Sequence, residues 1–133
     1  MTELVCVDPA RVSDFWPFVE KSLRAAIEIN EISDFDCLER DVLDGKQLLW
    51  LAVNGKTIEA CATTALVKPF NRKICIITAC SGHHRERWLH LKKSIEEYAK
   101  NEGCAEIELF GRRGWERALD DYKVHAIILR KAL

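Results

Sequence analysis

The stretch Lys73–Trp88, KICIITACSGHHRERW, contains the change of pattern that determines the fold. Residues 73–80 form a continuous apolar run of strand length, rich in isoleucine, which is typical of a central strand covered on both faces. Beyond Gly82 the spacing becomes helical, with one apolar face made by Trp88, Leu91, Ile95 and Ala99. The sequence therefore predicts a buried strand that leads directly into an amphipathic helix, which ends at Gly103.

Further strands are predicted on either side of this stretch. Residues 105–110, AEIELF, follow the helix, so this strand should run parallel to the preceding one through a right-handed crossover. Upstream, QLLWLAV at 47–53 and KTIEACATTALV at 56–67 flank Asn54-Gly55, the strongest short signal for a β-hairpin. An antiparallel hairpin beside a parallel pair predicts a mixed sheet.

The two ends of the chain add helices and outer strands. Residues 4–7, LVCV, predict a short strand, and apolar residues at steps of three and four predict a helix after it. Ser33 with Asp36 resembles a capping box that starts a second helix. Near the C-terminus, residues 111–121 predict a short helix and residues 122–133, YKVHAIILRKAL, predict a last strand.

These elements predict an α/β (α+β) fold with a mixed, mostly antiparallel sheet, a central pair of parallel strands and helices on both faces. With 133 residues, 48% apolar and 31% charged, the chain fits one soluble domain over residues 1–133. Its first residues lack the apolar core of a signal peptide, and no window reaches the ~18 apolar residues of a membrane span. We therefore expect a cytoplasmic protein with no membrane partner. The six cysteines include no CxxC pair, which is typical of reduced thiols.

Charge is distributed unevenly along the chain. Residues 1–66 contain 6 basic and 12 acidic residues, a net charge of −6, whereas residues 67–133 contain 14 and 9, a net charge of +5. The basic half favours an anionic partner such as a phosphorylated cofactor, or else it attracts the acidic half within one domain. Its basic residues, Arg112 and Arg113 among them, are scattered with few aromatic residues between them, so nucleic acid is not an expected partner.

The junction after the central strand contains residue types that suggest three kinds of site. Cys80, His83 and His84 are good zinc ligands, but no fourth ligand lies nearby in the sequence, and we expect no metal. Cys80 with His83 suggests a reactive thiolate and its base, whereas the alternative is a buried strand cysteine without reactivity. Ser81, directly before the helical pattern, is a preferred N-cap residue.

The order of elements over the whole chain resembles the GNAT (Gcn5-related N-acetyltransferase) fold. The resemblance rests on the Asn54-Gly55 hairpin, on residues 73–80 with the following helix, on residues 105–110 and on the close at 111–133. In that family the central strand pairs with the pantetheine arm of acetyl-CoA, and the next helix presents its N-terminal amides to the pyrophosphate. Helix N-termini bind anions through free N–H groups and the helix dipole. The resemblance therefore implies acyl transfer from acetyl-CoA to an amine.

The resemblance also implies which residues form the site. The backbone of Ile77, Thr78, Ala79 and Cys80 would pair with the arm of the cofactor, and Ser81, Gly82, His83, His84 and Arg85 would receive the pyrophosphate. Glu59, on the second strand of the hairpin, would act as a general base through water, or would face solvent without a role. The acid in this family is a tyrosine of the last helix; Trp115 stands near that place, and Tyr122 follows the helix as the candidate.

The junction departs from the family at its glycines. The family pattern is Gln/Arg-x-x-Gly-x-Gly/Ala, whereas Gly82 is followed by two histidines and an arginine. Degenerate GNAT-like proteins of tailed phages and prophages, some of which are virion or assembly components, resemble the close GRRGWERALDDY at 111–122. Two hypotheses follow. The first is an acyl-CoA-dependent N-acyltransferase with a degenerate pyrophosphate loop, and the second is a catalytically inactive module that binds a phage or host protein.

Overall fold

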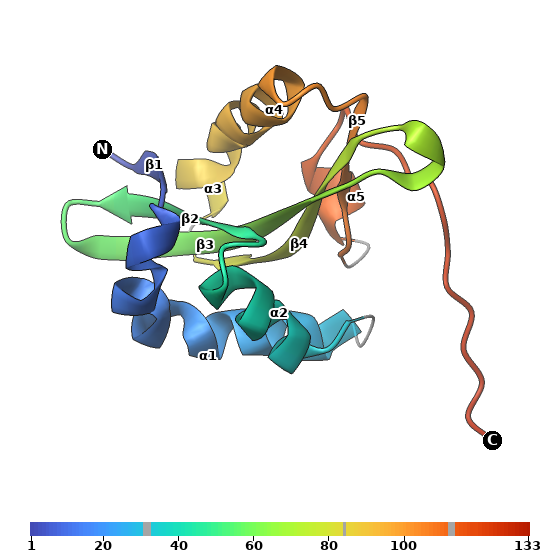
Figure 1. Ribbon diagram of the computed structural model, residues 1–133, viewed down its shortest axis with the longest axis horizontal. Helices are drawn as coiled ribbons and strands as arrows, with labels where there is room; N and C mark the ends of the chain where they lie inside the picture. Colours follow the sequence, from blue (N-terminus) through green and yellow to red (C-terminus); the bar gives the residue numbers. More distant parts are fainter. Residues whose placement is uncertain (31–32, 84, 112–113) are drawn as a thin grey trace.

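A five-stranded sheet in the order β1-β2-β3-β4-β5 lies at the centre of the protein (Figure 1). The computed structural model describes residues 1–30, 33–83, 85–111 and 114–133. Its strands are β1 (Glu3–Cys6), β2 (Leu48–Asn54), β3 (Thr57–Val67), β4 (Ile74–Gly82) and β5 (Glu106–Leu109). The first three pairings are antiparallel and the β4–β5 pairing is parallel, so the predicted mixed sheet is confirmed.

Helices cover both faces of the sheet, as predicted (Figure 1). The face drawn below the sheet holds α1 (Val12–Asn30) and α2 (Phe35–Leu43), and the opposite face holds α3 (Arg85–Trp88) and α4 (Lys92–Asn101). A short α5 (Gly114–Ala118) follows β5, and three 3₁₀ turns complete the chain: η1 (Pro9–Arg11), η2 (Pro69–Asn71) and η3 (Leu89–Leu91). Within the described ranges, no helix has the length and apolar character needed to cross a bilayer.

Two apolar cores, one on each face, hold these layers together. Leu23 of α1 and Leu49 of β2 are completely buried between α1, α2 and the sheet. On the other face Trp50, Ile77 and Ile95 pack with the half-buried Ile107 and Leu109 of β5. Complete burial of one leucine side chain contributes about 1.5–3 kcal/mol, so the α1 face is a strong anchor for the sheet.

The predicted hairpin is confirmed, and it contains a bulge. Asn54 pairs with Thr57, so the two-residue turn is Gly55-Lys56 rather than Asn54-Gly55, and Gly55 has a φ of +62°, the left-handed conformation that glycine supplies at the first position of such a turn. Ala52 pairs with Ala60, but Val53 pairs with Ile58, so Glu59 is an extra residue in β3. A second irregularity lies in β4, where Thr63 pairs with Ala79 and Thr64 pairs with Ile77, which leaves Thr78 as the extra residue. Bulges bend a strand and increase its twist.

Two predicted helix starts are wrong in detail. The cap of α2 is Asp34 rather than Ser33, because an oxygen of the Asp34 carboxylate accepts the Asp36 backbone N–H at 3.2 Å. Ser81 does not cap a helix, because it stays in β4 and pairs there with Cys61. The helical run after it is also divided. Trp88 leaves helical geometry (φ −127°) and packs against Ala52 and Ala60 of the sheet, so α4 starts only at Lys92.

The predicted last strand at 122–133 is wrong. This segment has no regular secondary structure and runs away from the body of the protein (Figure 1). A strand needs a neighbouring strand to satisfy its backbone N–H and C=O groups, and no strand in the described parts of the chain pairs with this segment. Five of its large apolar side chains are consequently exposed: Val124, Ile127, Ile128, Leu129 and Leu133.

Candidate functional site

A cavity of about 710 Å³ lies where β4 and β5 diverge. Ala25, Ala26 and Ile29 of α1 form one side, and residues Ala79–Gly82 of β4 form another. The remaining wall includes Arg85, Trp88, Leu109, Phe110, Gly111 and Trp115. The volume is within the roughly 300–1,000 Å³ of sites that bind small molecules and cofactors.

The cavity exists because β4 and β5 diverge and only β4 continues beyond that point. Their paired residues end at Ile77 and Leu109, after which Phe110 N–H donates to the Ile77 carbonyl at 3.4 Å. β4 then continues to Gly82, paired only with β3 among the described residues. Main chain of a strand edge therefore borders the open space, which is the arrangement that extended ligands use for strand-like hydrogen bonding.

Thr78, the bulged residue at this point of divergence, is fixed by buried polar groups. Its hydroxyl lies 2.7 Å from Oε1 of Gln47 and 2.6 Å from the Thr63 hydroxyl. Gln47 in turn donates through Nε2 to the Asp41 carboxylate at 3.3 Å. Both Gln47 and Thr63 are buried, so the bulge is held rigidly. No sequence pattern singles out Gln47, because it stands next to an apolar strand and matches no motif.

Gly82 has a packing role that its sequence context does not reveal. A Cβ atom at this position would lie 2.5 Å from the Ala60 Cβ and 2.7 Å from the Glu59 carbonyl oxygen. The absence of a side chain thus allows β3 and β4 to approach each other at the end of the sheet. The glycine is required for strand packing whether or not a ligand binds beside it.

Arg85 and Trp115 make the polar and aromatic part of the cavity wall. The Arg85 guanidinium carbon lies 5.6 Å from the centroid of the Trp115 ring. That ring packs over Gly111, where a Cβ would lie 2.6 Å from its Cδ1 atom. Trp88 supports it from the sheet side, with the two indoles 6.4 Å apart, and fixes the junction by donating to the His83 carbonyl at 2.7 Å.

The structure argues against a reactive thiolate at Cys80. Burial, with a smaller contribution from Cys61, raises the pKa of the Cys80 thiol to about 12, so the thiol stays protonated at neutral pH. The side chain of its proposed base, His83, is exposed, while the His83 backbone N–H donates to the Glu59 carbonyl at 2.9 Å.

His84, Arg112 and Arg113 lie outside the described residues. Among those that are described, no three His, Cys, Asp or Glu side chains gather as metal ligands would.

Glu59 is buried rather than facing solvent. One of its oxygens, Oε1, lies 3.4 Å from Nη1 of Arg87 and 3.3 Å from the Thr2 hydroxyl. The other, Oε2, is buried without a hydrogen-bond partner in the described part of the chain. Burial acts to raise the pKa of this carboxyl, but Asn54, the charge of Arg87 and the Thr2 hydroxyl together hold the pKa below its ordinary value. Glu59 is therefore a buried carboxylate, outside the residues that line the large cavity.

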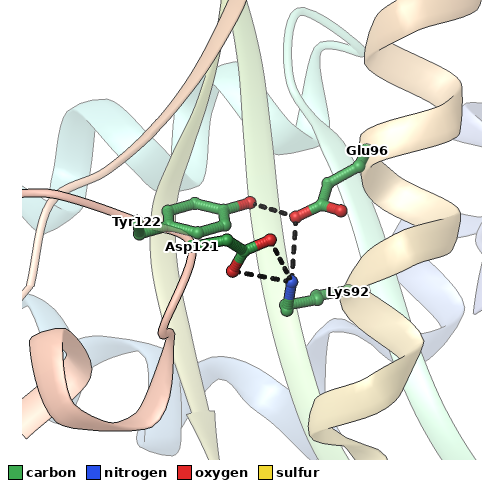
Figure 2. A network of polar contacts seen from close by, with 4 residues as sticks. All are labelled: Lys92, Glu96, Asp121 and Tyr122. Atoms are coloured by element: carbon green, nitrogen blue, oxygen red, sulfur yellow. Dashed lines mark hydrogen bonds and ion pairs between the residues drawn. The ribbon is translucent and has the colours of Figure 1, made fainter.

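Tyr122 belongs to a polar network that ties the end of the folded chain to α4 (Figure 2). Its hydroxyl donates to Oε2 of Glu96 at 2.6 Å. Lys92 donates to the same Glu96 oxygen and to both Asp121 oxygens at 3.2–3.3 Å. Burial and the neighbouring Glu96 carboxylate raise the pKa of Tyr122 far above its ordinary value, so the phenol keeps its proton. Tyr122 lines a small apolar cavity beside Trp115 and Leu109 rather than the large one.

Comparison with known proteins gives matches at the level of structure. No protein-family model and no curated protein matches the sequence. A ribosomal-protein-alanine N-acetyltransferase from Brucella melitensis biovar Abortus 2308 superposes with a TM-score of 0.69 at 12% identity, covering 100% of this chain and 99% of that one. An aminoglycoside acetyltransferase, meta-AAC0020, from an uncultured soil metagenomic sample gives 0.68 at 12% identity, covering 99% and 96%. The chain has the GNAT fold.

A third GNAT structure bears on the cavity. A predicted acetyltransferase from Clostridium acetobutylicum, solved with acetyl-CoA, superposes with a TM-score of 0.63 at 14% identity and covers 99% of this chain and 96% of that one. At such identities the likeness establishes the fold alone. Of the predicted site residues on β4, Ala79–Gly82 line the large cavity, whereas Ile77 lines the small apolar cavity and Thr78 lines neither.

Proposed function

We propose that this protein is an acyl-CoA-dependent N-acyltransferase. The observation that carries the proposal is the cavity of about 710 Å³ at the divergence of β4 and β5, bordered by the main chain of Ala79–Gly82. The three similar structures reported above are described as acetyltransferases, and one of them was solved with acetyl-CoA. These likenesses support the proposal, although they concern the fold alone.

The residues around the cavity fit an acyl-CoA in three respects. The backbone of Ile77–Cys80 offers a strand edge for the amide groups of the pantetheine arm. Ser81–Arg85 would receive the pyrophosphate, with the Arg85 guanidinium as the cation that points at the same space. The apolar side chains of α1, with Ile29 exposed, offer the opposite wall. This assignment includes Gly82, although a glycine is needed at that position for the packing of β3 against β4 in any case.

The chemistry needs a base and an acid. Acetyl-CoA, when bound, supplies the acyl group as a thioester. We assign Glu59 as the base that takes a proton from the acceptor amine through water, because its carboxylate is ionised and one oxygen has no hydrogen-bond partner among the described residues. We assign Tyr122 as the acid for the departing thiolate, because its phenol carries a proton at neutral pH and would pass it to the thiolate after releasing the hydrogen bond to Glu96. Calorimetry tests the cofactor site, and the turnover of single variants tests these two assignments.

The decisive experiment is a calorimetric titration with acetyl-CoA. We expect binding by the natural chain and loss of binding in Ala25→Trp, since Ala25 is exposed on α1 and lines the cavity that the indole would fill. Glu28→Trp is the matched control, because Glu28 is also exposed on α1 but lies outside the cavity lining. Absence of binding by the natural chain, or equal binding by both variants, would contradict the proposal.

Turnover is then measured as CoA release, separated by chromatography, with two kinds of acceptor. The aminoglycoside sisomicin and a peptide with an N-terminal alanine represent the acceptors named for the similar structures. Glu59→Gln and Tyr122→Phe should each lower the rate while leaving acetyl-CoA affinity unchanged, because neither side chain lines the cavity. Unchanged rates in a variant would remove that residue from the mechanism.

A second candidate is a catalytically inactive GNAT-fold module, of the kind found in phages, that binds a phage or host protein. The observation that favours it is that both proposed catalytic groups are already engaged, Glu59 by Arg87 and Tyr122 by Glu96. This candidate predicts no CoA release with any amine. Catalytic release above the rate of spontaneous thioester hydrolysis would exclude it.

A further inference from the structure

A second, smaller cavity lies beside the large one, between the sheet and α4. Its volume is about 60 Å³, and Ile77 of β4 and Ile95 of α4 form opposite parts of its wall. Five residues line both cavities: Cys80, Trp88, Leu89, Leu109 and Trp115. The two cavities are therefore neighbours that share part of their walls.

The lining of the small cavity is apolar. Among the described residues that form it, only Lys92 and Tyr122 carry a charge or a hydroxyl group. Lys92 Nζ and the Tyr122 hydroxyl both donate to Oε2 of Glu96, so their polar ends already have a partner (Figure 2). An apolar cavity stays free of water and binds apolar groups instead.

Three alanines of the sheet leave room for this cavity. Ala52 of β2 pairs with Ala60 of β3, and Ala62 lies two residues farther along β3. All three are buried and line the cavity, where a longer side chain would fill the space. An empty space of this kind lowers stability, because the atoms around it lack contacts on one side. A bound apolar group would restore those contacts.

The small cavity lies where the acyl group of a bound cofactor would end. This step rests on the proposed function, in which Ser81–Arg85 receive the pyrophosphate and Ile77–Cys80 border the pantetheine arm. The thioester then lies at the Ile77 end of the arm, where Ile77 pairs with Leu109 before the two strands diverge. Ile77 and Leu109 both line the small cavity, so an acyl chain longer than acetyl would enter it.

We propose that the small cavity holds the acyl chain of the donor, and that the preferred donor is a short-chain acyl-CoA such as butanoyl-CoA. One water-sized group needs roughly 10–15 Å³ of cavity, so a volume of about 60 Å³ has room for about four carbon atoms. An acetyl group leaves most of this space empty, whereas an octanoyl chain exceeds it. Tyr122, the assigned acid, lines the same cavity and thus lies on the thioester side of the site.

Calorimetric titration of the full chain with free CoA and with acetyl-, butanoyl- and octanoyl-CoA tests the proposal. Burial of one methylene raises affinity about fourfold, so butanoyl-CoA should bind roughly tenfold more tightly than acetyl-CoA. Octanoyl-CoA should bind no more tightly than butanoyl-CoA, because the cavity is already full. Equal affinities for CoA, acetyl-CoA and butanoyl-CoA would overturn this proposal and leave the cofactor site standing. Failure of all four compounds to bind would overturn the acyltransferase assignment and this proposal with it.

Two variants locate the acyl chain. Ala62→Val narrows the small cavity, so the ratio of butanoyl-CoA affinity to acetyl-CoA affinity should fall toward one. Ala65→Val, at a half-buried position of the same strand outside the lining of both cavities, is the matched control and should keep the natural ratio. Leu119→Ala widens the small cavity and should make octanoyl-CoA the tightest ligand, a gain that a loss of stability alone would not produce. A natural ratio in Ala62→Val, or an unchanged order of affinities in Leu119→Ala, would overturn the proposal.

Discussion

The Thr78 hydroxyl lies 2.7 Å from Oε1 of Gln47, and this contact joins the bulge of β4 to the turn that precedes β2. Gln47 is 8% exposed, and its amide also donates to the carboxylate of Asp41, which lies in the last turn of α2. A buried hydrogen-bonded chain of this kind is costly to interrupt, because the groups left behind lose their partners. The position at which the sheet opens is thus set by side chains on the opposite side of β4 from β5.

Thr78→Val tests this conclusion. The substitution keeps the shape of the side chain but removes the hydroxyl that contacts Gln47 and Thr63, so we expect a loss of about 1–3 kcal/mol in the free energy of unfolding. Thr57→Val, an exposed threonine at the start of β3, is the control and should change little. Urea unfolding measures both. Equal stabilities of the two variants would show that the network does not hold the bulge.

Gly82→Ala should destabilise the sheet. The new methyl group would meet the Ala60 side chain at 2.5 Å, so we expect a cost of about 1–3 kcal/mol from overpacking. Adding Ala60→Gly should recover part of the loss, but not all, because the Glu59 carbonyl oxygen is also close. Gly114→Ala, where a Cβ meets no atom within 4 Å, is the control. Thermal unfolding that ranks Gly82→Ala with Gly114→Ala would contradict the packing role.

Stability should fall in alkaline solution. Burial raises the pKa of Cys75 to about 11 and that of Cys80 to about 12 in the folded chain. Folding raises both pKa values. The two thiols therefore contribute fully to the free energy of unfolding below the pKa of the unfolded thiols, and this contribution is lost as pH rises through their pKa values in the folded chain. The urea midpoint should therefore decrease between about pH 9 and pH 12.

The reactivity of Cys80 gives an independent reading of the same shift. Alkylation at pH 8 followed by peptide mapping should show Cys80 reacting far more slowly in the folded chain than in the urea-unfolded chain. The thiolate is the reactive form, and the folded thiol stays protonated at that pH. Equal rates would mean that folding does not suppress the thiol, and a faster rate in the folded chain would mean that Cys80 is a reactive thiolate.

Tyr122→Phe should loosen the attachment of the chain end to α4. The phenol donates to a carboxylate at 2.6 Å, and a hydrogen bond to a charged group is worth about 1.5–3 kcal/mol. Tyr98→Phe, on α4 itself, is the control, because the described residues provide no hydrogen bond to that hydroxyl and its ring still packs against Trp50. Urea unfolding should give Tyr122→Phe a clearly lower free energy of unfolding than the control. Coincident unfolding curves would contradict the role of Tyr122 in attaching the chain end to α4.

Much of the fold follows from local patterns. The hairpin around Gly55, the apolar run of β4 and the parallel strand after the helix were predictable, because turn chemistry and periodicity act over a few neighbouring residues. The break at Trp88 was not, because helical spacing continues through it. Only contact with Ala52 and Ala60, more than twenty residues away in sequence, turns the indole out of the helix.

The candidate site was predictable as a place but not as a set of side chains. The strand-to-helix junction does border the cavity, yet Ser81 is a strand residue there rather than a cap. Gln47, Trp115 and Ala25 meet this junction only through tertiary packing, so no spacing in the sequence connects them to it. Likewise, strand propensity predicted residues 122–133 as a strand, whereas pairing depends on a neighbour that propensity does not supply.

Beyond Ile77 no described strand pairs with the β5-facing edge of β4, so Ala79–Gly82 have backbone groups available beside the cavity, and this has a consequence for how such a protein changes over generations. Every residue has the same peptide group. Substitutions along this wall therefore change the amino-acid sequence more than they change the hydrogen-bonding groups that a ligand would contact. A fold can then stay superposable at 12% identity, even though the two sequences no longer share recognisable motifs.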